Sequence, residues 1–126
     1  MSTQGINKTK YHDMPIREPF LSLIRKEEKR VEGRVNSIMC RRLRTGDFIH
    51  FFNRCYGILC KITFLHDYSS FEQMLKREGV SNLLPGIHSI REGIRVYENF
   101  PGANREKRCG VVAIGIRVID DNYSKE

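Results

Sequence analysis

Five segments of the chain have the hydrophobic pattern of β-strands. In residues 31–35 the apolar positions alternate with Glu32 and Arg34, so these two charged side chains leave the same face of the strand. Residues 110–119 are almost wholly apolar and rich in β-branched side chains, which is typical of a strand buried on both faces. A turn around Asn53 joins the third predicted strand to the fourth as a β-hairpin. The predicted strands cover residues 11–16, 31–35, 47–52, 56–65 and 110–119.

Three further segments have the spacing of short amphipathic helices, with apolar side chains at i, i+3 and i+4. They cover residues 19–26, 69–77 and 89–99. Ser69 or Ser70 can cap the second of them. The resulting order is a strand, a helix, several strands, two short helices and a closing strand. This order predicts an α+β fold in which a small β-barrel packs against helices.

The length of 126 residues fits one domain, because a chain of this size can bury roughly two thirds of its unfolded surface in one core. Residues 1–10 are predicted to form a flexible leader and residues 120–126 a flexible tail. Neither segment carries enough apolar side chains to offset the entropy lost on ordering. The domain itself is predicted to cover residues 11–119.

The charge of the chain narrows the choice of partners. Its 22 lysines and arginines outnumber its 15 aspartates and glutamates, which gives a net charge of +7. This excess attracts polyanions and releases their counterions, so nucleic acid is the first partner to consider. Most of the excess lies in residues 25–44, where eight basic side chains accompany three glutamates. Such a run is usually a solvated face, and the alternative is an anion-binding edge.

The cysteines and the N-terminal residues indicate where the chain functions. The four cysteines form neither a CxxC pair nor a Cys/His cluster with the spacing of zinc ligands, so we expect no metal and no cofactor. The N-terminal stretch is polar, and no apolar run approaches the roughly 20 residues that a membrane span needs. We therefore expect a cytoplasmic or nuclear protein with reduced thiols.

Lys29, Glu32 and Arg34 are the first candidates for a functional site. Glu32 and Arg34 are two apart on a strand, so their side chains leave one face roughly 6–7 Å apart, and Lys29 precedes them at the turn from helix to strand. An arginine can grip a phosphate or a base edge, a lysine supplies a point charge, and a glutamate accepts hydrogen bonds from amino or hydroxyl groups. A nucleotide or nucleoside has all of these features.

Residues 29–34, with the sequence Lys-Arg-Val-Glu-Gly-Arg, resemble the GxKxxExR signature of the ASCH (activating signal cointegrator homology) domain. The pattern of that family continues with a Gly-Asp pair, matched by Gly46-Asp47, and ends in an apolar strand like residues 110–119. Glu27 stands where the family usually has glycine, so the turn before Lys29 could differ in shape. The resemblance covers about residues 11–119.

The resemblance implies a small PUA-like β-barrel with short flanking helices, similar to RNA-binding barrels. It also implies that Lys29, Glu32 and Arg34 line a charged cleft between the barrel and the first helix. Tyr97 could reach this cleft to stack on a base, although its spacing with Ile90 and Ile94 also fits a core position. Three arginines of the next loop could contact phosphates or simply stay hydrated; they are Arg41, Arg42 and Arg44.

The resemblance also implies an enzymatic alternative. Some small bacterial members of the family deacetylate N4-acetylcytidine, with a lysine that matches Lys29 activating a threonine three residues later. Glu32 holds the threonine position here, and Glu78 is the plausible match for a glutamate that assists. The missing nucleophile favours binding, and Glu32 would keep Lys29 charged and poorly basic. Hydrolysis of a modified nucleoside or of RNA stays open, because Glu32 or Glu78 could activate a water.

Three hypotheses follow for the function. The first is a module that binds RNA, a nucleotide or a nucleoside in the charged cleft. The second is the hydrolase, with Lys29, Glu32 and Glu78 as its catalytic residues. The third is a protein-interaction module of a transcription or translation complex. In each case we expect a monomer that does not bind a membrane.

Overall fold

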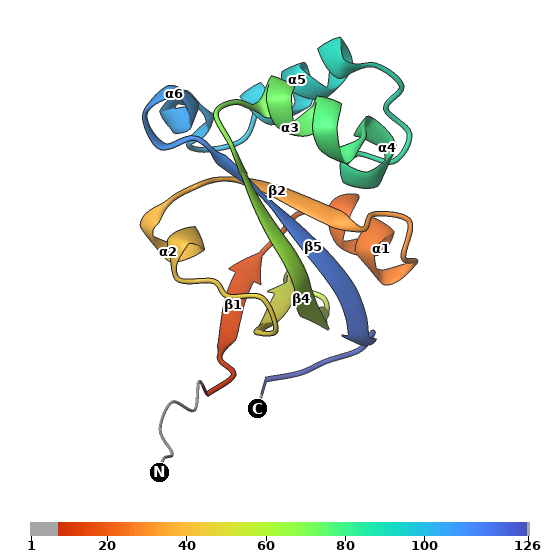
Figure 1. Cartoon of the computed structure of the whole chain (residues 1–126). Coiled ribbons are helices and arrows are strands. Elements are labelled where there is room, and N and C mark those ends of the chain that lie inside the picture. The colour runs from red at the N-terminus through yellow and green to blue at the C-terminus, as the bar shows by residue number, and fades with distance from the viewer. Residues whose placement is uncertain (1–7, 126) are drawn as a thin grey trace.

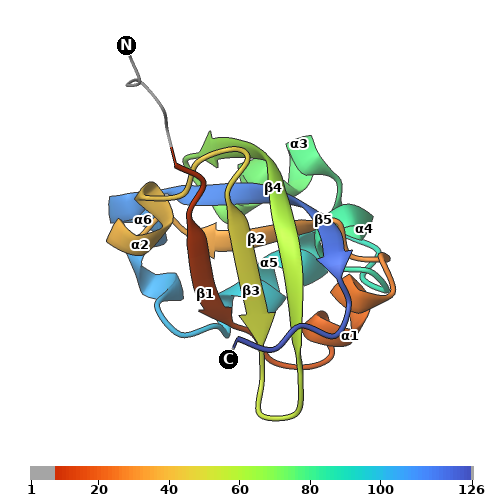
Figure 2. The same ribbon diagram turned by 90° about the horizontal axis from the view of Figure 1, so that it is seen from below.

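A curled five-stranded sheet forms the frame of the protein (Figures 1 and 2). The computed structural model describes residues 8–125. The strands are β1 (Tyr11–Pro15), β2 (Val31–Val35), β3 (Phe48–Phe52), β4 (Gly57–Tyr68) and β5 (Val111–Asp120). Their order in the sheet is β1-β3-β4-β5-β2, so β1 and β2 are its two edges. The β1–β3 pair is parallel and the other pairs are antiparallel, and the sheet curls into a half-barrel.

The helices are short and surround this sheet. They are α1 (Phe20–Arg25), α2 (Ile38–Arg41), α3 (Phe71–Glu78), α4 (Val80–Leu83), α5 (Ile90–Glu98), the 3₁₀ turn η1 (Ala103–Arg105) and α6 (Glu106–Cys109). Figure 1 shows α3, α4 and α5 gathered on one side of the sheet. Ser70 caps α3 by accepting a hydrogen bond from the backbone of Gln73. The α+β class and the small barrel with short helices are thereby confirmed.

Strand β5 separates two hydrophobic cores. Its side chains alternate, so that Val112 and Ile114 pack inside the barrel, whereas Val111 and Ala113 pack against the helices. The prediction of a strand buried on both faces is therefore confirmed for residues 111–116, whereas residues 117–120 are exposed or half-buried. Val31 of β2 also lies in the helical core. Because neighbouring strand residues face opposite sides, Glu32 and Arg34 are turned away from that core.

The described part of the C-terminal tail contacts β1 and the start of β4. Residues 1–7 of the predicted leader fall outside the described residues. In the tail, the backbone N–H of Tyr123 donates to the carbonyl of Gly57 at 2.8 Å, and Lys125 pairs with Asp13 of β1 at 2.5 Å. The predicted flexibility of both segments stays a prediction.

Gly33 lies where β2 meets the helical core. A Cβ at this position would come within 2.5 Å of the Met74 Cε atom and 2.8 Å of the Tyr97 hydroxyl. The methionine end can shift, but the tyrosine ring is stacked on Phe71 with centroids 4.7 Å apart. The close approach of β2 to α5 therefore requires glycine at this position.

We expect Gly33→Ala to lower the free energy of unfolding by about 1–3 kcal/mol, because the added methyl overpacks this contact. Urea denaturation measures the effect. The loss should be smaller when Tyr97→Phe is already present, since that substitution removes the hydroxyl that the methyl would meet. If Gly33→Ala lowers the free energy of unfolding equally with Tyr97 and with Phe at position 97, the Tyr97 hydroxyl is not what requires glycine at position 33.

Candidate functional site

A cleft of about 690 Å³ opens at the C-terminal ends of β1 and β3. Its walls come from segments that are far apart in the sequence, including α1, β2, the β3–β4 turn and the residues after α5. The charged residues that line it are Arg17, Lys29, Glu32, Arg34 and Arg54. The aromatic residues that line it are Phe20, Phe52, Tyr97 and Phe100. The cleft therefore combines a stacking surface with a small set of charges.

Lys29 is buried at one side of this cleft, with 2% of its surface exposed. Its Nζ atom donates to the carbonyls of Val31 at 2.8 Å and Leu83 at 2.5 Å, and it contacts Oε1 of Glu32 at 3.2 Å. An ammonium group has three N–H donors, so these acceptors occupy all of them. Burial lowers the pKa of Lys29, and Glu32 opposes this effect. Lys29 thus ties the start of β2 to α4.

Glu32 lies between two cations. Its carboxylate contacts Lys29 through Oε1 and accepts from the Arg34 Nε atom through Oε2 at 2.6 Å. Burial alone would raise the pKa of Glu32, but the attraction of Lys29 and Arg34 and their hydrogen bonds outweigh burial and hold the pKa below its usual value. Glu32 is therefore a carboxylate at neutral pH.

Arg34 joins the two edges of the sheet. Besides its bond to Glu32, it donates from Nη2 to the carbonyl of Pro15 at 2.9 Å. Pro15 ends β1 and Arg34 lies on β2, so the guanidinium bridges the open side of the half-barrel. Its side chain is 26% exposed. These two bonds use Nε and Nη2, and Nη1 takes part in neither of them.

The turn before Lys29 has an unusual backbone. Glu27, which stands where the family signature usually has glycine, has a φ of 62°. Left-handed backbone of this kind favours glycine, and any other residue at such a position loses roughly 1–2 kcal/mol of stability. The backbone N–H groups of Glu28 and Lys29 then both donate to the carbonyl of Leu23 at 3.0 Å. Glu27 thus keeps a conformation typical of glycine, and the turn delivers Lys29 to the protein interior.

Tyr97 belongs to both the core and the cleft. Its ring is 1% exposed and lies parallel to that of Phe71 in the helical core. Its hydroxyl has no hydrogen-bond partner among residues 8–125. Burial and the nearby Glu32 raise the pKa of Tyr97 well above its usual value, so the hydroxyl stays a neutral donor. It is the polar group through which α5 adjoins the cleft.

The remaining predicted site residues lie elsewhere. Arg42 and Arg44 line a separate hollow, and none of the three loop arginines is among the residues that line the cleft. Glu78 also lies outside the cleft lining, and its carboxylate accepts from Tyr68 at 2.5 Å and contacts His66 at 2.7 Å. Burial and Glu78 raise the pKa of Tyr68 to about 12. Glu78 is therefore already engaged on another part of the surface.

Sequence reasoning missed the residues that form the rim and walls of the cleft. Arg17 and Arg54 are exposed at its edge, and Arg17 lies over the Phe100 ring at 4.6 Å. Phe52 ends strand β3, where its hydrophobicity indicated only a strand position. The sequence holds no signal that groups these residues, because the curl of the sheet alone brings them together.

The curled five-stranded sheet with short flanking helices is a fold that a solved ASCH structure shares. The model of the ASCH domain family matches residues 14–120. The chain belongs to the ASCH domain family, as the signature at Lys29, Glu32 and Arg34 indicated. A comparison with curated proteins found no match.

Solved structures share the fold. The crystal structure of hypothetical protein PH0355 is 39% identical, with a TM-score of 0.80, over 88% of this chain and 100% of that one. The solution structure of protein PF0455 from Pyrococcus furiosus is 37% identical, with a TM-score of 0.71, over 88% of this chain and 98% of that one. An ASCH crystal structure from Zymomonas mobilis, at 15% identity, has a TM-score of 0.53 over 83% of this chain and 65% of that one, which supports the fold alone.

Two features are absent from residues 8–125. Residues 8–125 include no helix that is long and apolar enough to cross a membrane. The same residues include no group of three or more histidine, cysteine, aspartate or glutamate side chains arranged to hold a metal ion.

We expect Glu32→Gln to lower the free energy of unfolding at pH 7 by about 3–5 kcal/mol, because it leaves buried positive charge without its counterion. The matched control is Glu72→Gln, which breaks an exposed pair with Lys76 at 3.0 Å and should cost less than about 0.5 kcal/mol. Urea denaturation of both variants measures the difference.

The wild type and Glu32→Gln also give a test of how stability depends on pH. Because the folded state holds the pKa of Glu32 below its usual value, its stabilisation is present above the ordinary carboxyl pKa of about 4.3 and is lost as the pH falls through the lower folded value. The stability gap between the wild type and Glu32→Gln should therefore shrink in acid. A gap that is the same at pH 7 and pH 3 would contradict the charged pairing.

Proposed function

We propose that the protein binds RNA or a nucleotide, with a nucleobase in the cleft between the barrel and α1. One observation carries this proposal: the cleft places a carboxylate and a guanidinium, fixed against each other at 2.6 Å, beside aromatic walls. A planar base with polar edges needs both kinds of surface. The net charge of +7 favours a ligand that carries phosphate.

Each part of the cleft has a distinct role in this proposal. Phe52 and Phe100 offer ring faces for stacking, which is worth about 1–3 kcal/mol per base. Glu32 accepts from an exocyclic amino group or a ribose hydroxyl, and Nη1 of Arg34 donates to a base edge or a phosphate. Arg17 and Arg54 at the rim attract the phosphate.

Lys29 has a positioning role in this proposal. Its three donors are taken by Val31, Leu83 and Glu32, so it holds the carboxylate in place and leaves contact with the ligand to Arg34. The same saturation weighs against the amidohydrolase alternative. A base must have a free lone pair within reach of the proton that it abstracts, and burial with three acceptors denies this to Lys29.

The other two hypotheses have less support. A hydrolase in which Glu78 assists at the cleft would need that carboxylate to leave His66 and Tyr68. A protein-interaction module would need an apolar contact surface. Ile38 and Met39 on α2 are exposed, at 73% and 36%, but two side chains make only a small patch.

We expect Phe52→Leu to weaken the binding of a labelled single-stranded RNA by about 5- to 100-fold, because it removes one stacking face. The matched control is Phe64→Leu on β4, since Phe64 is half-buried like Phe52, stacks on His66 at 4.4 Å and lines neither the cleft nor the hollow at Arg42 and Arg44. Fluorescence anisotropy measures both affinities. Equal affinities for the two variants would remove the cleft from consideration.

The same proteins test the hydrolase directly. Incubation with N4-acetylcytidine or with single-stranded RNA, followed by chromatography, should return the starting material. Product formation that Glu32→Gln abolishes would favour the hydrolase over a binding module.

A further inference from the structure

A second hollow, of about 750 Å³, lies at the opposite end of β1 and β3 from the cleft. Two separate segments supply its basic side chains. Lys8 and Lys10 precede β1, and Arg42 and Arg44 lie in the connection from α2 to β3. Four basic residues from two segments thus line one concave surface.

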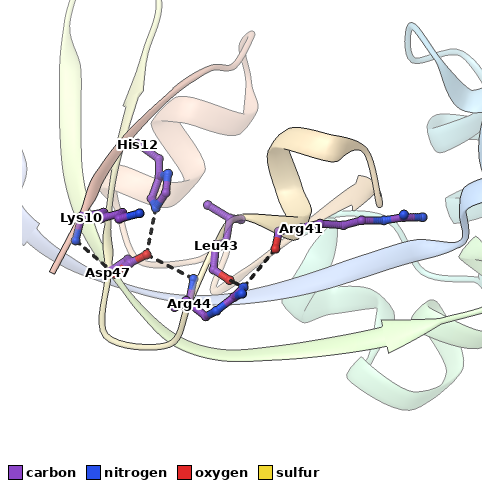
Figure 3. Close-up of polar contacts among 6 residues, drawn as sticks. All are labelled: Lys10, His12, Arg41, Leu43, Arg44 and Asp47. Carbon is purple, nitrogen blue, oxygen red and sulfur yellow. Dashed lines mark hydrogen bonds and ion pairs between the residues drawn. The ribbon is translucent and has the colours of Figure 1, made fainter. Parts of the chain in front are cut away.

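Asp47 joins these two segments (Figure 3). Its carboxylate accepts from the backbone N–H groups of Lys10 and Arg44, each at 3.2 Å, and contacts the His12 ring at 2.9 Å. Asp47 is 5% exposed. Asp47 itself lines the hollow, and its carboxylate is engaged by these two N–H groups and by His12, which holds the two segments together.

The basic side chains themselves keep their charge. Nη1 of Arg44 donates to the carbonyls of Arg41 and Leu43, each at 2.9 Å, which orients the guanidinium without neutralising it. None of the four basic residues takes part in an ion pair with another described residue. A hollow lined by four cations without ion-pair partners, one of them oriented by hydrogen bonds, suits phosphate groups.

We propose that this hollow, which we call the basic hollow, binds backbone phosphates of a nucleic acid strand whose base occupies the cleft. The inference rests on the proposed function and extends it from a mononucleotide to a polynucleotide. It names Lys8, Lys10, Arg42 and Arg44 as a site separate from the cleft. The chemistry is that of the phosphodiester, which RNA and DNA share.

The parallel pairing of β1 with β3 fixes the distance between the two sites. Tyr11 pairs with Phe48 beside the basic hollow, and Pro15 pairs with Phe52 beside the cleft. From Tyr11 to Pro15 there are four steps of about 3.3 Å, so the two ends of the strand pair are roughly 13 Å apart. Phosphates of one stacked strand are about 3.4 Å apart along its axis, so about four nucleotides bridge this distance. One nucleotide cannot occupy both sites.

The test uses the double variant Lys10→Gln with Arg42→Gln, because the side chains of Lys10 and Arg42 make no hydrogen bond among those described for residues 8–125. The matched control is Arg41→Gln with Lys107→Gln, which removes the same charge from exposed positions outside the basic hollow. Figure 3 shows the Arg41 side chain pointing away from Asp47. Thermal unfolding of both double variants checks that they are folded.

The probes are a 12-nucleotide single-stranded RNA, the matching DNA and a nucleoside monophosphate, each at several salt concentrations. The basic-hollow variant should bind RNA about tenfold more weakly than the control, with a salt slope that is smaller by about 1.4 for two lost phosphate contacts. Its affinity for the monophosphate should be unchanged. DNA should lose affinity in the same proportion as RNA.

Two outcomes overturn the basic hollow as a separate site. One is an equal loss in the variant and its control, which would mean that only net charge matters. The other is a parallel loss of monophosphate binding, which would mean a single site. Failure of the proposed function looks different, because the monophosphate would then not bind the wild type and Phe52→Leu would have no effect. Absence of any binding to both 12-mers would overturn the basic hollow as well.

Discussion

The carboxylate of Glu32, held between Lys29 and Arg34, is the interaction on which the closure of the fold depends. Through Lys29 the carboxylate is linked to the carbonyl of Leu83 at the end of α4, and through Arg34 to the carbonyl of Pro15 on the far edge of the sheet. Taking such charges out of water costs several kcal/mol per ion, which is offset only when every partner is in place. Because each buried charge needs its partner, the positions of the Lys29, Glu32 and Arg34 side chains are fixed relative to one another.

This buried chain of charges also prepares the cleft. A carboxylate and a guanidinium that already bond each other need little reorganisation when a ligand arrives, so less free energy of binding is lost to ordering side chains. The aromatic residues beside them come from the ends of β3 and α5, which the curl of the sheet brings to the same place. The structural and the proposed functional roles of Glu32 and Arg34 therefore share one geometry.

The sequence predicted those features that repeat with the period of a strand or helix. The alternation in residues 31–35 placed Glu32 and Arg34 on one face, and the apolar run of β5 predicted burial on both faces. Helices of one turn, such as α2 and α4, are too short to show a period and were not predicted.

Other features depend on contacts between distant segments, which a single sequence does not reveal. The saturation of Lys29 by the carbonyl of Leu83 is one of them, because a backbone carbonyl carries no sequence signal. The separation of Arg42 and Arg44 from the cleft is another, since it follows from the length of β1 and β3 and from the link at Asp47. The sequence showed that the loop is basic, but it did not show that Arg42 and Arg44 line a hollow together with Lys8 and Lys10.

The most direct measurement is a titration of the ¹⁵N-labelled protein with a nucleoside monophosphate, followed by NMR. We expect the largest shifts at the Arg34 Nε–H group, which faces Glu32, and at the backbone amides of Gly33 and Phe52. Shifts confined to residues 8–10 and 42–47, with the Arg34 Nε–H signal unmoved, would contradict the assignment of the cleft as the base-binding site.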